Sequence, residues 1–225
     1  MIGSEHVKTP NIDKLACEGI RFTNWYSNSP VCSPSRASLL TGKYPIRTGV
    51  DHILTGKRGH AGLSNQHETL PSKLKENGYK TAMFGKWHLG TTPETRPNAH
   101  GFDEFFGFHA GCVDYYSHIF YWESPPVHDL WENEEEVWEN GEYLTESITE
   151  RAVNFIQDQN MDQPSIFQFF WANRPPLFDR SIDFSILSGE LNAPIRPFNR
   201  FFNSFGRIER SYSTVQSTFQ FFRAN

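Results

Sequence analysis

A cysteine followed closely by an arginine forms the first segment whose residue types could do chemistry. Cys32 begins the run Cys-Ser-Pro-Ser-Arg, and Arg36 ends it. Residues 34–41 are predicted to form a short helix that ends at Gly42, because proline suits a first helical turn and glycine suits a helix end. At a helix N-terminus, free backbone N–H groups and the helix dipole favour an anion. Since an arginine one turn further on can bind two anionic oxygens at once, the segment predicts an anion site beside Cys32.

A lysine and a histidine form the second segment of this kind. Lys86 and His88 follow residues 79–84, a run of strand-forming residues that comes directly after Gly78. Open α/β sheets place their sites at the carboxyl ends of their strands. Residues two apart in an extended chain point to the same side. The segment therefore predicts a cation and a proton acceptor side by side at the end of a strand.

Together, the two segments resemble the two signatures of the formylglycine-dependent, arylsulfatase-like sulfatases. Residues 32–43 match the first signature, residues 78–90 match the second, and the resemblance covers roughly residues 6–176. It implies a sulfuric ester hydrolase in which a separate enzyme oxidises Cys32 to formylglycine. The hydrated aldehyde would then attack the sulfur of a sulfate ester and later release sulfate.

The resemblance also implies a role for each of four residues. Arg36 and Lys86 would bind the sulfate and neutralise its charge, and His88 would accept a proton or position the formylglycine hydroxyl. Cys32, Arg36, Lys86 and His88 are thus the expected catalytic residues. The expected partners are a small sulfated substrate and a formylglycine-generating or other sulfatase-maturating enzyme. Aryl, steroid, sugar and glycosaminoglycan sulfates all remain open as substrates.

The resemblance implies a Ca²⁺ or Mg²⁺ ion, to which Cys32, as formylglycine, would contribute a ligand. The other ligands of the family are missing from this chain: residues 1–7 lack the expected aspartate pair, and no Asp-Asn pair follows the last predicted strand. Pro176 stands where the family has a sulfate-contacting histidine, and no lysine follows Lys86. Because a hard cation takes six to eight oxygen ligands, the alternative is a catalytically incompetent sulfatase remnant.

Two further alternatives belong to other classes of protein. Cys32 could be a redox-active thiol, although no second cysteine lies nearby in the sequence. A phosphoryl-transfer relative on the same fold would use serine or threonine as its nucleophile, and Ser33 is adjacent. The presence of Cys32 in the motif argues against that relative.

The order of predicted elements indicates the fold class. A helix, a glycine and a strand in succession are typical of an α/β unit, and residues 165–171 are apolar without interruption, as in a buried parallel strand. The resemblance implies an incomplete alkaline-phosphatase-like sandwich, with a mainly parallel sheet flanked by helices. We expect residues 1–176 to be part of a sulfatase catalytic domain and 177–225 to be an unassigned divergent tail. Helices are predicted at 9–18, 34–41, 70–77 and 145–158, and strands at 20–26, 79–84 and 165–171.

Composition excludes several other classes. A formal net charge of −5 without a run of basic residues does not suggest nucleic-acid binding. No apolar stretch is long enough to cross a bilayer. Three cysteines give no disulfide framework and no zinc-ligand spacing. The N-terminus does not have the pattern of a signal peptide, so location is left unassigned.

The remaining polar residues carry weaker predictions. Residues 101–107 match a further family segment and are expected to serve packing and loop structure. The acidic run 132–139 is expected to be a solvated face, and a role in substrate specificity is considered for Asp114, Tyr115, Tyr116 and His118. Isolated histidines lack the i, i+4 spacing of a helical metal pair and are predicted to be surface or loop residues, including His52, His60, His67, His109, His118 and His128.

Overall fold

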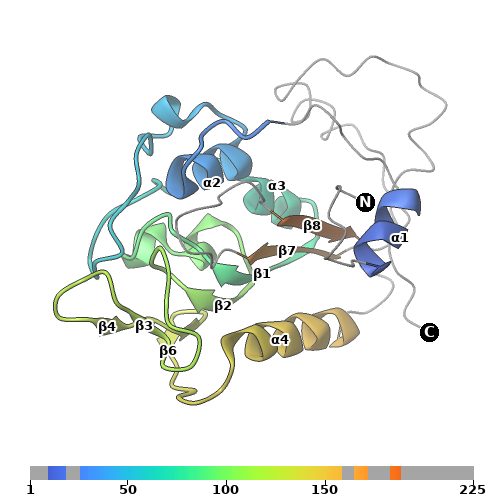
Figure 1. Cartoon of the computed structure of the whole chain (residues 1–225). Helices are drawn as coiled ribbons and strands as arrows, with labels where there is room; N and C mark the ends of the chain where they lie inside the picture. Colours follow the sequence, from blue (N-terminus) through green and yellow to red (C-terminus); the bar gives the residue numbers. More distant parts are fainter. Residues whose placement is uncertain (1–9, 19–25, 159–164, 172–182, 189–225) are drawn as a thin grey trace.

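Three layers make up the part of the protein that the computed structural model describes, which is residues 10–18, 26–158, 165–171 and 183–188. A six-stranded sheet lies in the middle, with α2 and α3 on one side and α4 on the other (Figure 1). The helices are α1 (Pro10–Glu18), α2 (Cys32–Thr41), α3 (Leu70–Glu76) and α4 (Leu144–Asp158), with short 3-10 turns at Pro45–Arg47, Pro93–Thr95 and Pro97–His100.

The sheet has a parallel centre and antiparallel edges. Its strand order is β6-β5-β2-β1-β7-β8. Strand β1 pairs in parallel with β2 and β7, whereas the β2–β5, β5–β6 and β7–β8 pairs are antiparallel. A separate two-stranded hairpin joins β3 to β4. The strands are β1 (Lys80–Lys86), β2 (Glu104–Phe108), β3 (Ile119–Phe120), β4 (Val127–His128), β5 (Trp131–Glu132), β6 (Glu135–Glu136), β7 (Ser165–Trp171) and β8 (Asp183–Ser188).

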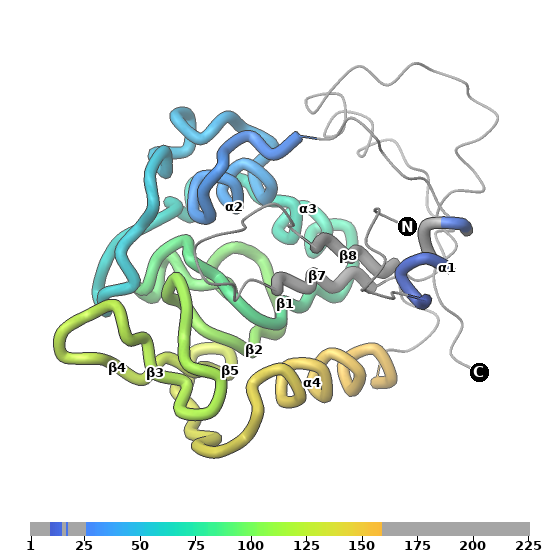
Figure 2. Tube along the Cα trace, in the orientation of Figure 1, coloured from blue at the N-terminus to red at the C-terminus, as the bar shows by residue number. Residues whose placement is uncertain are grey.

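Alternation along β1 and β2 divides the core between the two faces of the sheet. Successive strand residues point to opposite faces, so Phe84 and Phe106 pack with the apolar stripe of α4, while Met83 and Phe105 pack with α2. Figure 2 traces the same layers along the chain. Both faces of the central strands are therefore covered, as a parallel sheet requires.

Two glycines permit an unusually close approach of the central strands. Gly85 and Gly107 stand opposite each other in the β1–β2 register. A Cβ atom added to Gly107, whose φ is +154°, would lie 1.9 Å from the carbonyl oxygen of Gly85. Any side chain at Gly107 would push β1 and β2 apart just where both strands approach their carboxyl ends.

Most predicted elements are confirmed, with ends that differ by one or two residues. The helices over 9–18, 34–41, 70–77 and 145–158 correspond to α1 to α4, and the strands over 79–84 and 165–171 correspond to β1 and β7. The α/β fold with its flanked sheet is confirmed as well. The predicted strand 20–26, the N-terminal residues 1–7 and the segment around Pro176 lie outside the described residues, apart from Tyr26.

Three expectations need correction. The segment 101–107 does serve packing, but it contains most of β2, a strand beside the centre of the sheet, and is not mainly a loop. The edges of the sheet are antiparallel, which the helix–strand order did not suggest. Within the tail, residues 183–188 form β8 on β7, where no strand was predicted. None of the described helices is long and apolar enough to cross a membrane.

Candidate active site

Helix α2 places Cys32 at its first position and Arg36 one turn later. The preceding residue, Val31, is extended, and its side chain does not cap the helix. The N–H groups of the first turn are therefore not satisfied by a capping side chain at Val31. Gly42 ends the helix in the left-handed conformation at φ +67°, as its position predicts. Cys32 is half-buried, while the Arg36 side chain is buried.

A single hydrogen bond joins the two segments singled out in the sequence. Arg36 Nη1 donates to the carbonyl oxygen of Lys86 over 2.6 Å. Fifty positions separate the two residues in the chain, and the bond is buried. The guanidinium of α2 is thus held at the carboxyl end of β1, beside the buried Lys86.

The two ring nitrogens of His88 differ in their hydrogen bonding. Its Nε2 lies 2.9 Å from the carbonyl oxygen of Leu54. Since a carbonyl oxygen only accepts, Nε2 must carry the hydrogen of a neutral ring. The buried Nδ1 has no hydrogen-bond partner among the described residues. Nδ1 is therefore the nitrogen of His88 that can accept a proton.

Burial and positive neighbours keep His88 neutral. Burial lowers its pKa to about 3, and the charges of Lys86 and Arg36 act in the same direction, while the hydrogen bond to Leu54 opposes them. A second bond ties this carbonyl segment back to α2, because the Leu54 N–H donates to Ser33 Oγ over 3.1 Å. The structure therefore brings Arg36, Lys86 and His88 into one electrostatic environment.

The chain turns sharply between Lys86 and His88, where an extended segment was expected. Strand β1 ends at Lys86, and His88 adopts a positive φ of +59°. Residues 87 and 88 still donate to the next strand segment: Trp87 N to Phe108 O over 2.9 Å and His88 N to His109 O over 3.1 Å. The argument from extended geometry was wrong, although Lys86 does influence His88.

Cys112 belongs to the same environment, and no spacing in the sequence pointed to it. Burial raises the pKa of its thiol, a hydrogen bond with Tyr121 and the charge of Lys86 oppose this rise, and Cys32 adds to it. Lys86 and Cys32 thus both act electrostatically on Cys112. Cys32 itself is linked to Arg36 through helix α2.

A divalent-cation site is not formed by the described residues alone. Nowhere among them do three or more histidine, cysteine, aspartate or glutamate side chains gather in a way that could hold a metal ion. The described part of the chain therefore does not by itself fit the Ca²⁺ or Mg²⁺ ion that the resemblance implies.

Several histidines predicted to be surface or loop residues are buried. His109, His118 and His128 are 2%, 0% and 7% exposed. His109 stacks on Phe105 with a ring separation of 5.3 Å, which explains its burial. His52 and His60 are exposed, as predicted. Single-residue spacing did not reveal this burial, because it arises from contacts between distant segments.

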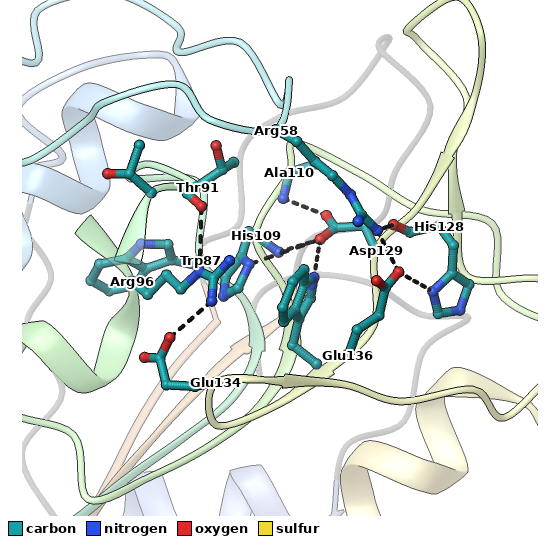
Figure 3. A network of polar contacts seen from close by, with 12 residues as sticks. Arg58, Trp87, Thr91, Arg96, His109, Ala110, His128, Asp129, Glu134 and Glu136 are labelled. Carbon is teal, nitrogen blue, oxygen red and sulfur yellow. Dashed lines mark hydrogen bonds and ion pairs between the residues drawn. The ribbon is translucent and has the colours of Figure 1, made fainter. Parts of the chain in front are cut away.

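The acidic run is partly engaged in ion pairs. Figure 3 shows Glu134 beside Arg96 and Glu136 between Arg58 and His128. The first pair spans 2.9 Å and the Glu136–His128 pair 3.0 Å. Glu134 is exposed despite its ion pair, as predicted, whereas Glu136 is only 22% exposed, so the prediction of a solvated face was wrong for Glu136.

The suggested specificity segment has a structural role for at least two of its residues. Asp114 Oδ1 accepts hydrogen bonds from the backbone N–H groups of Tyr116 and Ser117, so it stabilises its own turn. His118 is fully buried. A role of this segment in substrate choice stays a prediction.

The described fold and site define an α/β protein of the alkaline-phosphatase-like type with two buried cationic side chains, Arg36 and Lys86, at the carboxyl end of its central strands. The Sulfatase family model matches residues 1–172. Arylsulfatase J of Mus musculus is 37% identical over 220 residues, which cover 96% of this chain and 34% of that protein. N-acetylgalactosamine-6-sulfatase of Homo sapiens is 37% identical over 188 residues, covering 76% of this chain and 35% of that protein.

Solved structures of other proteins are also similar to this chain. The crystal structure of Ps i-CgsB superposes with a TM-score of 0.66 at 33% identity, covering 78% of this chain and 41% of that one. The structure of BT4656 in complex with its substrate D-glucosamine-2-N,6-O-disulfate has a TM-score of 0.57 at 34% identity, covering 73% and 29%. The chain belongs to the sulfatase family. It spans about a third of the length of the two curated relatives named above.

Proposed function

We propose that the protein hydrolyses sulfate esters, and that its nucleophile is formylglycine formed from Cys32. The observation that carries the proposal is the 2.6 Å bond from Arg36 Nη1 to the Lys86 carbonyl, because it joins the two signature segments at one end of the sheet. Family membership supports the reaction class. The maturation of Cys32 requires a separate formylglycine-generating or related enzyme.

The charges of the site suit a tetrahedral anion. Arg36 and Lys86 are buried cations, and a charge in a buried site interacts more strongly than in water. They would neutralise the oxygens of the sulfate while the sulfur is attacked. Preorganised charge of this kind is among the largest contributions to catalysis.

His88 would take the proton that the reaction releases. Its Nδ1 is an unprotonated acceptor at neutral pH because the pKa of the ring is lowered to about 3. When the sulfated intermediate collapses, the remaining hydroxyl on the same carbon must lose its proton, so that the aldehyde C=O forms and the C–O bond to sulfate breaks. A positioned base at this step contributes roughly 10² to 10⁴ in rate.

The substrate class and the domain limits form part of the proposal. The names of the relatives include an N-acetylgalactosamine-6-sulfatase, and BT4656 was solved with a sulfated glucosamine. These names support a sulfated sugar as substrate. We assign residues 1–176 to a portion of the catalytic domain, which the family match over 1–172 supports, and 177–225 to a divergent tail.

The test is co-expression with a formylglycine-generating enzyme. Mass spectrometry of the peptide that contains Cys32 is expected to show loss of hydrogen sulfide and gain of oxygen, and the purified protein is expected to hydrolyse 4-nitrophenyl sulfate. Unmodified thiol after co-expression would contradict the nucleophile. Complete conversion of Cys32 without any turnover would favour the catalytically incompetent alternative.

A further inference from the structure

We propose that Asp129 is a positioning residue that holds segment 109–111 against His88. The inference rests on the proposed function of His88 and adds a residue that no sequence motif identified. It concerns the network drawn in Figure 3, which lies between the carboxyl end of β2 and strand β5.

The carboxylate of Asp129 binds three donors. Its Oδ2 accepts from the Ala110 N–H over 2.7 Å, and its Oδ1 accepts from the His109 N–H over 3.3 Å and from Trp131 Nε1 over 2.7 Å. Two consecutive backbone N–H groups are thus directed at one side chain. Asp129 therefore determines the course of the chain just after β2.

This stretch of chain makes two contacts with His88. The His88 N–H donates to the carbonyl oxygen of His109 over 3.1 Å. The Cα atom of Gly111 lies so near the imidazole that an added Cβ would stand 2.9 Å from Cε1 and 3.1 Å from Nε2 of His88. The backbone held by Asp129 therefore contacts both the main chain and the ring of His88.

Aromatic and cationic side chains hold the network from outside. The guanidinium of Arg96 lies 4.3 Å from the ring centroid of Trp131, and that of Arg58 lies 5.6 Å from it. Arg58 also donates to the carbonyl oxygen of His128 over 2.7 Å, next to Asp129 in the chain. Trp131 is thereby held in the orientation in which its indole N–H meets Asp129.

Retention of a charge at this position is unfavourable for folding alone. Burial raises the pKa of Asp129 to about 6, although the Ala110, His109 and Trp131 donors and the charge of Arg58 oppose the rise. His109 Nδ1 is 4.0 Å away, but burial lowers the pKa of His109 to about 3, so that ring adds no positive charge. A carboxylate that folding alone would prefer neutral indicates a role in shaping the site.

The decisive variant is Asp129→Asn in the full chain. An asparagine has nearly the same shape, but whichever way its amide is placed, its NH₂ group faces an N–H of Ala110 or of His109 and Trp131. We expect the unfolding midpoint at pH 7 to change little, because removal of a buried charge offsets the cost of the N–H donors that lose their acceptor. We expect kcat for 4-nitrophenyl sulfate to fall about tenfold to a hundredfold, with KM nearly unchanged, because small displacements of a catalytic group reduce rates by such factors.

A second measurement keeps this inference separate from the proposed function. NMR of the ¹⁵N-labelled imidazoles, with the His88 signals assigned by their loss in His88→Gln, reports the environment of His88 whether or not the protein turns over. Asp129→Asn is expected to shift these signals. An inactive parent protein would contradict the proposed function, and the imidazole signals would still test the positioning role.

The matched control is Asp103→Asn. Asp103 also binds a backbone N–H, that of Thr81 at 3.0 Å, but at the start of β1 and far along the strand from His88. It is expected to leave kcat and the His88 signals unchanged. If Asp129→Asn does not fold, Trp131→Phe, which removes one donor to the carboxylate and keeps an aromatic ring, must shift the His88 signals in its place. A folded Asp129→Asn with unchanged kcat and unchanged His88 signals would overturn the inference. If Asp129→Asn does not fold, a folded Trp131→Phe with unchanged His88 signals would overturn it.

Discussion

Two aspartates bind backbone N–H groups at opposite ends of the central strand pair. At the start of β1, Asp103 accepts from Thr81 N–H and pairs with Lys75 over 2.7 Å. Beyond the carboxyl end of β2, Asp129 accepts from His109 and Ala110. The pKa of Asp103 is lowered, because the Lys75 and Thr81 bonds outweigh its burial, whereas burial raises that of Asp129 to about 6.

The difference shows that a carboxylate with similar backbone hydrogen bonds can either stabilise or destabilise the fold by its charge. The charge of Asp103 stabilises the fold, since its surroundings favour the ionised form. The charge of Asp129 opposes folding, and it lies where Lys86 and His88 leave the sheet. Strain of this kind is found at functional sites, where the surrounding structure must hold an unfavourable arrangement.

The largest expected effect is the loss of the proposed nucleophile at the carboxyl end of the strands. Cys32→Ala is expected to reduce sulfatase activity to background, because no other side chain can become the aldehyde. Cys17→Ala, which changes an exposed cysteine of α1, is expected to keep full activity. Both are measured as kcat for 4-nitrophenyl sulfate after co-expression with the maturing enzyme. Activity that survives in Cys32→Ala would remove Cys32 from the mechanism.

The next effect compares two buried histidines with the same hydrogen-bond pattern. His88 and His100 each place Nε2 against a backbone carbonyl, at 2.9 Å and 3.1 Å, and each leaves Nδ1 without a described partner. Burial lowers the pKa of His100 to about 4, but the charges of Lys86 and Arg36 act only on His88. His88→Gln is expected to lower kcat by roughly 10² to 10⁴.

His100→Gln is the matched control for that substitution. It is expected to lower the free energy of unfolding by about 1–3 kcal/mol, the usual effect of disturbing a buried hydrogen bond. We expect kcat to stay within about twofold, because the His100 ring packs on Trp87 at 5.3 Å and its pKa is not influenced by the charges of Lys86 and Arg36 that act on His88. Urea unfolding and steady-state kinetics measure the two quantities. Equal losses of kcat in both variants would mean that His88 acts only through folding.

A smaller effect tests the bond between α2 and β1. Arg36→Lys keeps the positive charge but loses the planar fork that can bind the Lys86 carbonyl and an anion together. We expect kcat/KM to fall about 10- to 100-fold, which corresponds to the roughly 1.5–3 kcal/mol of a hydrogen bond that involves a charge. Arg151→Lys, on α4 over the ring of Phe106, is the control and is expected to change kcat/KM little.

The last effect concerns stability and not activity: the pH dependence of the free energy of unfolding should differ in sign between the two aspartates. The raised pKa of Asp129 means that its contribution is present below the unfolded value of 3.8 and is lost as pH rises through about 6. The stability of the parent protein relative to Asp129→Asn should therefore fall by on the order of 3 kcal/mol over that window. The lowered pKa of Asp103 means that its contribution is present above 3.8 and is lost as pH falls.

Urea unfolding from pH 3 to pH 7 measures both slopes. The parent protein should lose its advantage over Asp103→Asn at acid pH and its advantage over Asp129→Asn at neutral pH. The same sign for both aspartates would contradict the comparison.

Local signals in the sequence were sufficient for α2 and β1. Pro34 and Gly42 bound a helix that could be predicted with Cys32 at its beginning, and the residues before Lys86 have strand character. The signature segments also identified Arg36, Lys86 and His88 as a group. These features depend on near neighbours in the chain, so a single sequence contains them.

Strand β2, the antiparallel edges and the buried His109 could not be predicted in this way. A five-residue strand between loops is too short for its alternating pattern to be recognised. Its place beside β1 depends on the close approach of Gly85 and Gly107. The proposed role of Asp129 could not be predicted either, since His109 and Ala110, whose N–H groups it binds, lie about 20 positions away in the chain.

Composition, helix limits and the proposal for Cys32, Arg36, Lys86 and His88 came from the order of the residues, because caps, periods and motifs act over a few positions. The neutral state of His88, the bond between Arg36 and Lys86 and the buried charge of Asp129 arose only when distant segments packed together. Burial and long-range hydrogen bonds set these properties, and both are created by the fold as a whole.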